Sequence, residues 1–396
     1  MALAAETVVG VVGAGAMGMG IAQVAASHGH RVLLADENPD ALKRAEAAHL
    51  AAVEREVERG RLQRDQARSV IQNIVYVPGL GDGILKPFGH CALVIEAIIE
   101  RLTAKQELFA ALEAIVAVDT VLASNTSSLS IAALGGACRH AERVIGVHFF
   151  NPASVMPLVE IVPSLSTDPA VATATRALID TWGKTTVIAA DTPGFIVNRI
   201  ARPFYGEALR IVEEGIADHA TVDWAMRELG AFKMGPFELM DFIGNDVNYA
   251  VTTSVFEAMF YDPRYRPSLA QRRLVEAGRL GRKTKRGYYD YGPAAAKPEP
   301  RADAELGAAI VDRILAMLIN EAVEAVHLRI ASPADIELAM TKGVNYPKGL
   351  LAWGDELGAA TVLRRLVALQ EDYGEDRYRP SPLLRRLAAS GRRMLS

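Results

Sequence analysis

Two side chains in the stretch 148–160 have the types and surroundings of a general base and its orienting partner. His148 follows an apolar run, 143–147, that we expect to form a short buried strand, and the C-terminal ends of strands in an open α/β sheet face the ligand crevice. Glu160 lies in an apolar run of β type, 158–162, where an ionised carboxylate is costly unless it is paired. A buried pair would satisfy both groups and fix the tautomer of the imidazole. The alternative is a structural histidine and an edge-strand glutamate.

A glycine-rich turn near the N-terminus has the spacing of a dinucleotide-binding loop. An apolar run, 7–12, is followed at once by Gly13-Ala14-Gly15-Ala16-Met17-Gly18 and then by a helical pattern. The first glycine permits a tight turn, the second lets a pyrophosphate approach the backbone, and the third lets helix and strand pack closely. We therefore expect residues 13–18, including Ala16 and Met17, to hold the cofactor.

An acidic residue at the end of the next predicted strand indicates which cofactor binds. The strand, 31–35, ends in Asp36, at roughly the ~20-residue spacing of an acid that bonds the adenine ribose hydroxyls. Asp36 would repel a 2′-phosphate, and no arginine follows it closely, so NAD is favoured over NADP.

Polar residues also follow two later strand-like runs. Glu100 and Lys105 lie just beyond the run 92–97, on the predicted ligand side. A run at 121–123 precedes the cluster Ser124-Asn125-Thr126-Ser127-Ser128, whose hydroxyls either cap the next helix or bind substrate.

A helix is expected over 39–68, with basic residues interspersed among acids. Arg55, Arg59 and Arg61 lie around Gly60. They form either a solvated helical face or a site for an anionic ligand.

The pattern changes from α/β to all-α near residue 190. We expect a helix over 169–182 and a strand over 185–189, followed by a break at 191–194 and a long helix from Phe195. Asn198 lies in the first turn of that helix, where it either caps the helix or contacts a ligand. The fold class predicted is an α/β Rossmann-type doubly wound sheet, residues 1–188, followed by two tandem all-α helical domains, 189–292 and 305–396, joined by a proline-rich linker at 293–304.

The two helical segments are copies of each other. Eleven residues recur at a constant offset of 114, among them Arg199 as Arg313 and Glu207 as Glu321. The second copy has Asp312 at the position of Asn198 and lacks the segment 281–289, so we expect it to be structural.

Composition excludes several classes of function. The chain has 396 residues, a formal net charge of -4 and 50% hydrophobic residues, which gives no indication of nucleic-acid or membrane binding. Cys91 and Cys138 are the only cysteines and suggest neither a disulfide framework nor a metal site, which fits a reducing cytoplasm. Residues 1–6 show no signal peptide, and no apolar stretch is long enough to span a membrane.

These motifs together resemble the L-3-hydroxyacyl-coenzyme A dehydrogenase family, which includes bacterial 3-hydroxybutyryl-CoA and 3-hydroxyadipyl-CoA dehydrogenases. The resemblance covers the first 290 residues and rests on motifs in the family's order: 13–18, 125–129, 148–152, 191–199 and 234–239. A duplicated helical domain also occurs in longer family members. The chain has no room for the hydratase domain of the multifunctional relatives.

The resemblance implies roles for individual residues. His148 is the general base, Glu160 orients it, and Ser127 and Asn198 hold the substrate's oxygens. The positions that contact NAD in the family correspond to Asp36, Glu100, Lys105, Asn151 and Lys283. The positions of a serine and a lysine that bind coenzyme A in some family members correspond to Ala52 and Arg59, and Lys105 is a further candidate. Ala52 loses the serine's hydrogen bond, whereas Arg59 keeps the lysine's charge.

The activity implied is reversible oxidation of (S)-3-hydroxyacyl-CoA to 3-ketoacyl-CoA by NAD, in fatty-acid, hydroxybutyrate or aromatic-acid degradation. We expect oxidation to accelerate from mildly acidic to alkaline pH, because the base must be neutral. The alternatives are a dehydrogenase of a free hydroxy acid and a non-catalytic NAD-binding scaffold. In family dimers the helical domains of two subunits pack on each other. If the second helical copy takes the partner's place, the protein is a monomer; otherwise it is a homodimer. The sequence does not determine the length of the acyl chain or whether the acyl group ends in a carboxylate.

Overall fold

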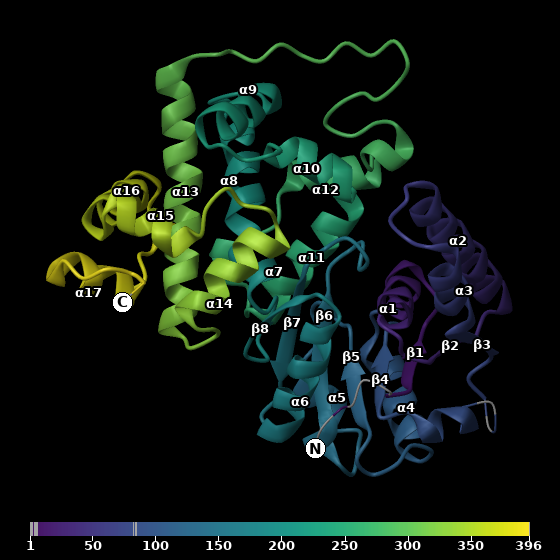
Figure 1. The fold of residues 1–396 in the computed structure, drawn as a ribbon. Coiled ribbons are helices and arrows are strands. Elements are labelled where there is room, and N and C mark those ends of the chain that lie inside the picture. The colour runs from purple at the N-terminus through teal and green to yellow at the C-terminus, as the bar shows by residue number, and fades with distance from the viewer. Residues whose placement is uncertain (1–2, 4–6, 82, 84, 396) are drawn as a thin grey trace. The chain divides into compact units, whose positions relative to one another are not determined.

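The computed structural model describes residues 3, 7–81, 83 and 85–395 (Figure 1). The chain divides into two compact units, Met1–Thr192 and Pro193–Ser396. The break lies within the predicted 191–194 segment, four residues beyond the predicted end of the first domain at 188. The expectation of no signal peptide concerned residues 1–6, which lie outside the described residues apart from Leu3.

The first unit is built on an eight-stranded sheet in the order β3-β2-β1-β4-β5-β6-β7-β8. Strands β1 to β6 are parallel, β7 runs antiparallel to β6, and β8 is parallel to β7. The order reverses between β1 and β4, which is the switch point where doubly wound sheets bind ligands. The strands are β1 (Val9–Val12), β2 (Val32–Asp36), β3 (Ile74–Pro78), β4 (Leu93–Glu96), β5 (Val121–Ser124), β6 (Val144–Phe149), β7 (Leu158–Pro163) and β8 (Thr185–Ile188).

This sheet confirms the predicted Rossmann-type fold, with one strand that the sequence analysis missed. Strand β3 forms the edge next to β2, and its β-branched sequence Ile74-Val75-Tyr76-Val77 is typical of a strand. The strands' apolar side chains and those of α1 (Ala16–Ser27) and α6 (Pro169–Thr181) form one continuous core.

The single helix predicted over 39–68 is wrong, because two helices occupy this region. α2 (Pro39–Glu58) ends before Gly60, and α3 (Arg64–Gln72) begins after a short turn. Gly60 has a φ of +69°, a left-handed conformation that ends helices and favours glycine. The remaining helices of this unit are η1 (Lys86–His90), α4 (Leu102–Glu113), α5 (Ile131–Gly135) and η2 (Ala141–Arg143).

The second unit is helical, and its elements occur twice in the same order. The first copy contains α7 (Val197–Ile200), α8 (Arg202–Glu213), α9 (His219–Trp224), η3 (Ala225–Leu229), α10 (Pro236–Ile243), α11 (Asn245–Ala258), η4 (Pro263–Tyr265), α12 (Leu269–Glu276) and η5 (Arg282–Thr284). The second contains α13 (Ala304–His327), α14 (Pro333–Leu338), η6 (Ala339–Gly343), α15 (Leu350–Leu357), α16 (Ala359–Tyr373), η7 (Asp376–Tyr378) and α17 (Pro382–Ser390). Figure 1 shows α13 as the longest helix of this unit, with elements of both copies beside it.

One proline explains why the first helix of the unit differs between the copies. The long helix predicted from Phe195 is broken between α7 and α8, whereas α13 is continuous. Pro203 stands near the start of α8 and has no amide hydrogen to donate to the preceding turn, and its counterpart Met317 has one.

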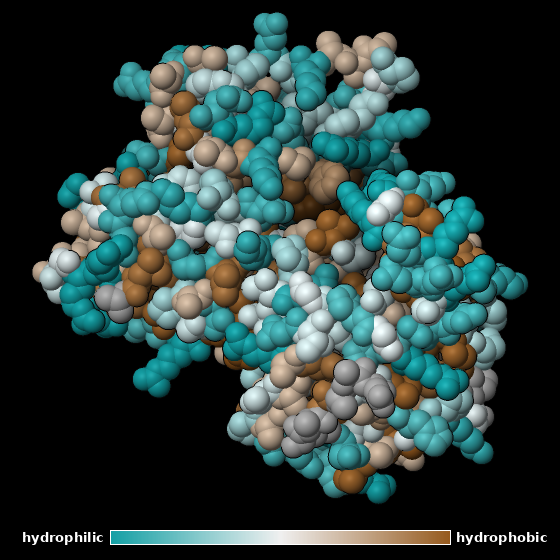
Figure 2. Space-filling view, viewed as in Figure 1, coloured by the Kyte–Doolittle hydropathy of each residue, from teal (hydrophilic) through white to brown (hydrophobic). Residues whose placement is uncertain are grey.

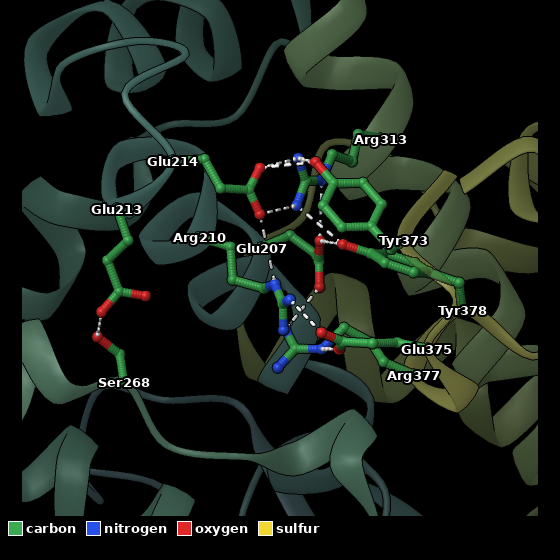
Figure 3. A network of polar contacts seen from close by, with 10 residues as sticks. All are labelled: Glu207, Arg210, Glu213, Glu214, Ser268, Arg313, Tyr373, Glu375, Arg377 and Tyr378. Carbon is green, nitrogen blue, oxygen red and sulfur yellow. Dashed lines mark hydrogen bonds and ion pairs between the residues drawn. The ribbon is translucent and has the colours of Figure 1, made fainter. Parts of the chain in front are cut away.

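The two copies exchange the same buried contacts, and Figure 3 shows those made by Glu207. Glu321 of the second copy accepts hydrogen bonds from Arg199, Arg264 and Tyr265 of the first at 2.6, 3.0 and 2.5 Å. Glu207 of the first copy accepts from the corresponding residues of the second, Arg313, Arg377 and Tyr378, at 3.0, 2.9 and 2.9 Å. Such reciprocity is the signature of an isologous, two-fold interface, formed here inside one chain.

Hydrophilic side chains predominate on the face shown in Figure 2, with hydrophobic ones dispersed among them. In the described part of the chain, no helix combines the length and the apolar character that crossing a bilayer requires.

Candidate active site

His148 and Glu160 form a buried pair on adjacent strands. They lie directly opposite each other in the antiparallel register of β6 and β7, and His148 Nδ1 lies 2.7 Å from Glu160 Oε2. Glu160 is fully buried and His148 is 6% exposed. His148 is the penultimate residue of β6, so it lies close to the carboxyl end of the parallel strands, as the sequence predicted.

The pairing determines which ring nitrogen can act as a base. An Nδ1–H that donates to the Glu160 carboxylate leaves the basic lone pair on Nε2. A carboxylate in this position also stabilises the imidazolium that forms when Nε2 takes up a proton. The ring of Phe150 packs at 4.5 Å from the imidazole and restricts its rotation further.

The three glycines of the turn after β1 have the three different environments that a dinucleotide requires. Gly13 has a φ of +104°, and a Cβ there would lie 2.5 Å from the carbonyl oxygen of Ala97. A Cβ on Gly18 would lie 1.7 Å from the carbonyl oxygen of Gly13, so only glycine permits this approach of helix to strand. A Cβ on Gly15 would meet nothing within 4 Å, which leaves the backbone accessible at the start of α1.

A cavity of about 790 Å³ opens beside this turn at the switch point of the sheet. Its lining includes Gly13 and Gly15 after β1, Asp36 at the end of β2, and Ala97 and Ile98 after β4. Asp36 accepts hydrogen bonds from the amides of Ala14 at 2.6 Å and Asn38 at 2.8 Å, so its carboxylate is held at the cavity wall. The residues present therefore fit NAD: they provide an open position for the pyrophosphate, a carboxylate for the ribose and a cavity beside both.

The polar loop after β5 is held by one carboxylate. Glu100 Oε1 accepts from Thr126 Oγ1 at 2.5 Å, from the Ser127 amide at 3.1 Å and from Ser128 Oγ at 3.0 Å. Ser127 Oγ itself has no hydrogen-bond partner among the described residues, which is the expected state of a hydroxyl kept for a ligand.

Lys105 lies under this loop. Its ammonium group is 1% exposed and contacts Glu96 at 2.5 Å and Glu100 at 3.2 Å. This enclosure does not favour the predicted direct contact of Lys105 with NAD or coenzyme A. The geometry instead supports a positioning role through Glu100.

The same contacts set the ionisation of Glu100. Burial raises the pKa of this carboxyl, but the Lys105 ammonium and the donors Thr126 and Ser127 outweigh burial, so the pKa lies below its ordinary value. Glu100 is therefore a carboxylate at neutral pH, as its role as an acceptor of several hydrogen bonds requires.

Two residues to which the sequence analysis assigned no role, Glu96 and Asn125, also hold the polar loop in place. Glu96, in β4, accepts from Ser124 Oγ at 2.6 Å as well as from Lys105. Asn125 Oδ1 accepts from the amide of Phe149 at 2.8 Å and ties the polar loop to the end of β6, next to His148. A signal was available for Glu96, because an acid inside an apolar core strand needs a cation, and Lys105 follows nine residues later.

Two predicted site residues lie in the second unit. Asn198, in α7, is partly exposed, and its side-chain amide makes no hydrogen bond with a described residue. Lys283, in η5, pairs with Asp246 at 2.6 Å and is 44% exposed. Asn151, which follows β6 in the first unit, is exposed.

A groove of about 440 Å³ lies on the other side of Gly15. Arg44, Ala52 and Arg55 of α2 line it, together with Pro152 and Ser154. The predicted coenzyme A contact Arg59 does not line the groove, and it pairs with Glu56 at 3.4 Å.

Comparison with known proteins identifies the family. The model "3-hydroxyacyl-CoA dehydrogenase, NAD binding domain" matches residues 8–192, and "3-hydroxyacyl-CoA dehydrogenase, C-terminal domain" matches 194–291 and again 310–394. The chain therefore belongs to the 3-hydroxyacyl-CoA dehydrogenase family. It is an NAD-dependent oxidoreductase that acts on 3-hydroxyacyl-CoA.

Individual relatives cover either almost the whole chain or about three quarters of it. The 3-hydroxyadipyl-CoA dehydrogenase of Escherichia coli is 38% identical over 96% of this chain and 97% of its own. The crystal structure of 3-hydroxybutyryl-CoA dehydrogenase from E. coli K12 has a TM-score of 0.90 and 37% identity, covering 98% of this chain and 99% of that one. The 3-hydroxybutyryl-CoA dehydrogenase of Bradyrhizobium diazoefficiens is 39% identical over 74% of this chain and 97% of its own.

Proposed function

We propose that His148 is the general base of the dehydrogenase, that Glu160 orients it, and that Ser127 and Asn198 bind the substrate's oxygens. The observation that carries the proposal is the buried 2.7 Å contact between His148 Nδ1 and Glu160, which directs the basic nitrogen Nε2 away from the carboxylate. Two of the proposed substrate contacts, Ser127 Oγ and the Asn198 amide, have no protein partner among the described residues.

The proton and hydride leave the substrate at neighbouring atoms. In oxidation, His148 Nε2 removes the proton of the 3-hydroxyl while C3 loses a hydride, and the oxygen becomes the 3-keto oxygen. NAD, when bound, supplies the hydride acceptor. Glu160 stabilises the imidazolium until the proton leaves to solvent, and reduction is the reverse.

NAD and coenzyme A bind mainly to different parts of the first unit. Asp36 bonds the adenine ribose, and the amides at the start of α1 meet the pyrophosphate beside Gly15. The cationic groove with Arg44 and Arg55 suits the phosphates of coenzyme A, with Arg59 at its margin. Glu100 and Lys105 keep Ser127 in place, and Asn151 and Lys283 are further NAD contacts.

The assembly and location belong to the same proposal. We expect a monomer, because the Glu207 and Glu321 contacts give the first helical copy an internal partner. Cys91 and Cys138 are free thiols, which suits a reducing cytoplasm.

The test compares a thioester with its free acid. Oxidation of NADH is followed by absorbance with acetoacetyl-CoA and, separately, with acetoacetate. We expect turnover with the thioester alone. Equal turnover of acetoacetate would favour the alternative, a dehydrogenase of free hydroxy acids, and NADH binding without turnover of either compound would favour a scaffold.

A further inference from the structure

One buried arginine in the second unit has no carboxylate partner. Arg202, at the start of α8, is 7% exposed. The other strongly buried arginines of this unit, Arg199, Arg264, Arg313 and Arg377, each contact a glutamate at 3.0 Å or less. No described carboxylate lies within ion-pair distance of Arg202.

The contacts of Arg202 are neutral and incomplete. Nε donates to the carbonyl oxygen of Asn198 at 2.8 Å, and Nη1 donates to Thr252 Oγ1 at 3.1 Å. The guanidinium lies 5.0 Å from the centre of the Tyr205 ring. Nη2 has no acceptor in the described part of the chain. Burial lowers the pKa of this guanidinium, and the residues around it include no anion to offset the cost.

A second buried polar group near Arg202 is also unpartnered. Tyr346, from the second copy, is 5% exposed, and its hydroxyl has no hydrogen-bond partner in the described residues. It interacts electrostatically with Arg202. An incoming carboxylate would satisfy both a cation and a hydroxyl donor that the protein leaves unsatisfied.

The face of the helix that carries Arg202 is open in the first copy. Arg202 and Gly206 are four residues apart in α8 and so share one face, and Arg202 Nε contacts the backbone of Asn198 in the preceding α7. A Cβ on Gly206 would meet nothing within 4 Å, which indicates open space one turn beyond Arg202.

The same face is closed in the second copy. The counterparts at an offset of 114 are Asp312, Ala316 and Asn320. Asp312 pairs with Arg365 at 2.7 Å, and Asn320 is fully buried between Ser381 and the carbonyl of Arg379. The interface residues Arg199 and Glu207 recur as Arg313 and Glu321, whereas Arg202 has Ala316 as its counterpart. An arginine therefore occurs at this position only in the copy that also has the asparagine and the open face, so its role is not to join the two copies.

We propose that Arg202 selects the substrate by the far end of its acyl group, binding a terminal carboxylate one helical turn from the oxygen that Asn198 holds. This inference rests on the proposed role of Asn198. Arg202 Nε lies 2.8 Å from the carbonyl oxygen of Asn198, so a few carbon–carbon bonds beyond C3 bring the end of the acyl group to the guanidinium. Tyr346 donates a second hydrogen bond to the same carboxylate, and a methyl-ended acyl group leaves both donors unpaired.

The test uses two thioesters of equal length, 3-oxoadipyl-CoA, which ends in a carboxylate, and 3-oxohexanoyl-CoA, which ends in a methyl group. We expect the wild-type protein to reduce the dicarboxylic ester with the higher kcat/KM. Arg202→Met should lower kcat/KM for 3-oxoadipyl-CoA about 10–100-fold, the value of a charge-assisted hydrogen bond, and change that for 3-oxohexanoyl-CoA little. Tyr346→Phe should cause a smaller loss in the same direction, and Arg202→Lys should retain part of the preference.

The outcomes separate this inference from the proposed function. Equal kcat/KM for the two esters in the wild type, or an equal loss for both in a folded Arg202→Met, would overturn the role of Arg202 and leave the dehydrogenase activity standing. Failure of the wild type to reduce either ester would overturn the proposed function itself. A second measurement, the rise in unfolding temperature caused by adipyl-CoA relative to hexanoyl-CoA, tests carboxylate binding without turnover, and Arg202→Met should abolish the difference.

Discussion

At the scale of single residues, the chemistry depends on which nitrogen of His148 carries a proton. The bond to Glu160 leaves Nε2 as the base, and positioned general bases typically contribute ~10²–10⁴-fold. We expect His148→Ala to lower kcat at least ~10²-fold in the assay with acetoacetyl-CoA and NADH. His148→Gln, which can still donate to the buried Glu160, serves as the second variant, because His148→Ala leaves a carboxylate unpaired. Full activity of a folded His148→Gln would show that His148 is not the general base.

The same base gives the oxidation reaction a pH dependence. A proton can leave the 3-hydroxyl only to an unprotonated Nε2, so the oxidation rate should rise from mildly acidic to alkaline pH. The measurement is single-turnover NADH formation with (S)-3-hydroxybutyryl-CoA as a function of pH. A flat profile in the hydride-transfer step would count against His148.

The glycine turn offers a matched pair of substitutions. Gly15→Ala meets open space, at a backbone φ of −68° that alanine adopts, whereas Gly18→Ala places a methyl group 1.7 Å from the Gly13 carbonyl oxygen. We expect Gly15→Ala to keep the unfolding temperature and weaken NADH binding, because its methyl group occupies the approach of the pyrophosphate. Gly18→Ala should lower both the unfolding temperature and the affinity for NADH. NADH fluorescence titration and thermal unfolding measure the two effects, and unchanged NADH affinity in Gly15→Ala would contradict the assigned site.

At the scale of elements, one carboxylate couples β4, α4 and the loop after β5. The pKa of Glu100 is below its ordinary value, so its ionised form stabilises the folded state above pH 4.5, and this contribution is lost as pH falls through the lowered pKa. The difference in unfolding free energy between the wild type and Glu100→Gln should be largest near neutral pH and shrink below 4.5. Denaturant titration at several pH values measures it. The exposed Glu58→Gln, outside this network, provides the control.

At the scale of the whole molecule, the duplicated helical region carries its own two-fold interface. Removing one partner of a buried ion pair typically costs ~3–5 kcal/mol. Glu321→Ala leaves Arg199 and Arg264 without a carboxylate partner, so we expect it to destabilise the second unit by about that amount in denaturant titration. The exposed Glu299→Ala, in the linker, is the matched control. A change below ~1 kcal/mol in Glu321→Ala would contradict the interface's contribution to stability.

The internal interface also predicts the mass in solution. Light scattering should give the mass of one chain, because the first copy already has a partner of its own fold. A concentration-independent dimer would show that the duplication did not replace the intermolecular contact.

The sequence by itself determined the parts of this protein that depend on local patterns. Strand, glycine turn and helix follow from apolar periodicity and glycine spacing, and the duplication follows from a constant offset. The pairing of His148 with Glu160 was also predictable, because a carboxylate in an apolar strand requires a partner.

Only the tertiary structure decided features that arise between elements distant in the chain. The edge strand β3 exists because β2 provides its hydrogen bonds. The enclosure of Lys105 and the isolation of Arg202 depend on which charges packing brings within a few ångströms. Sequence spacing carries no record of these distances, since electrostatic and hydrogen-bond energies depend on separation in space and not along the chain.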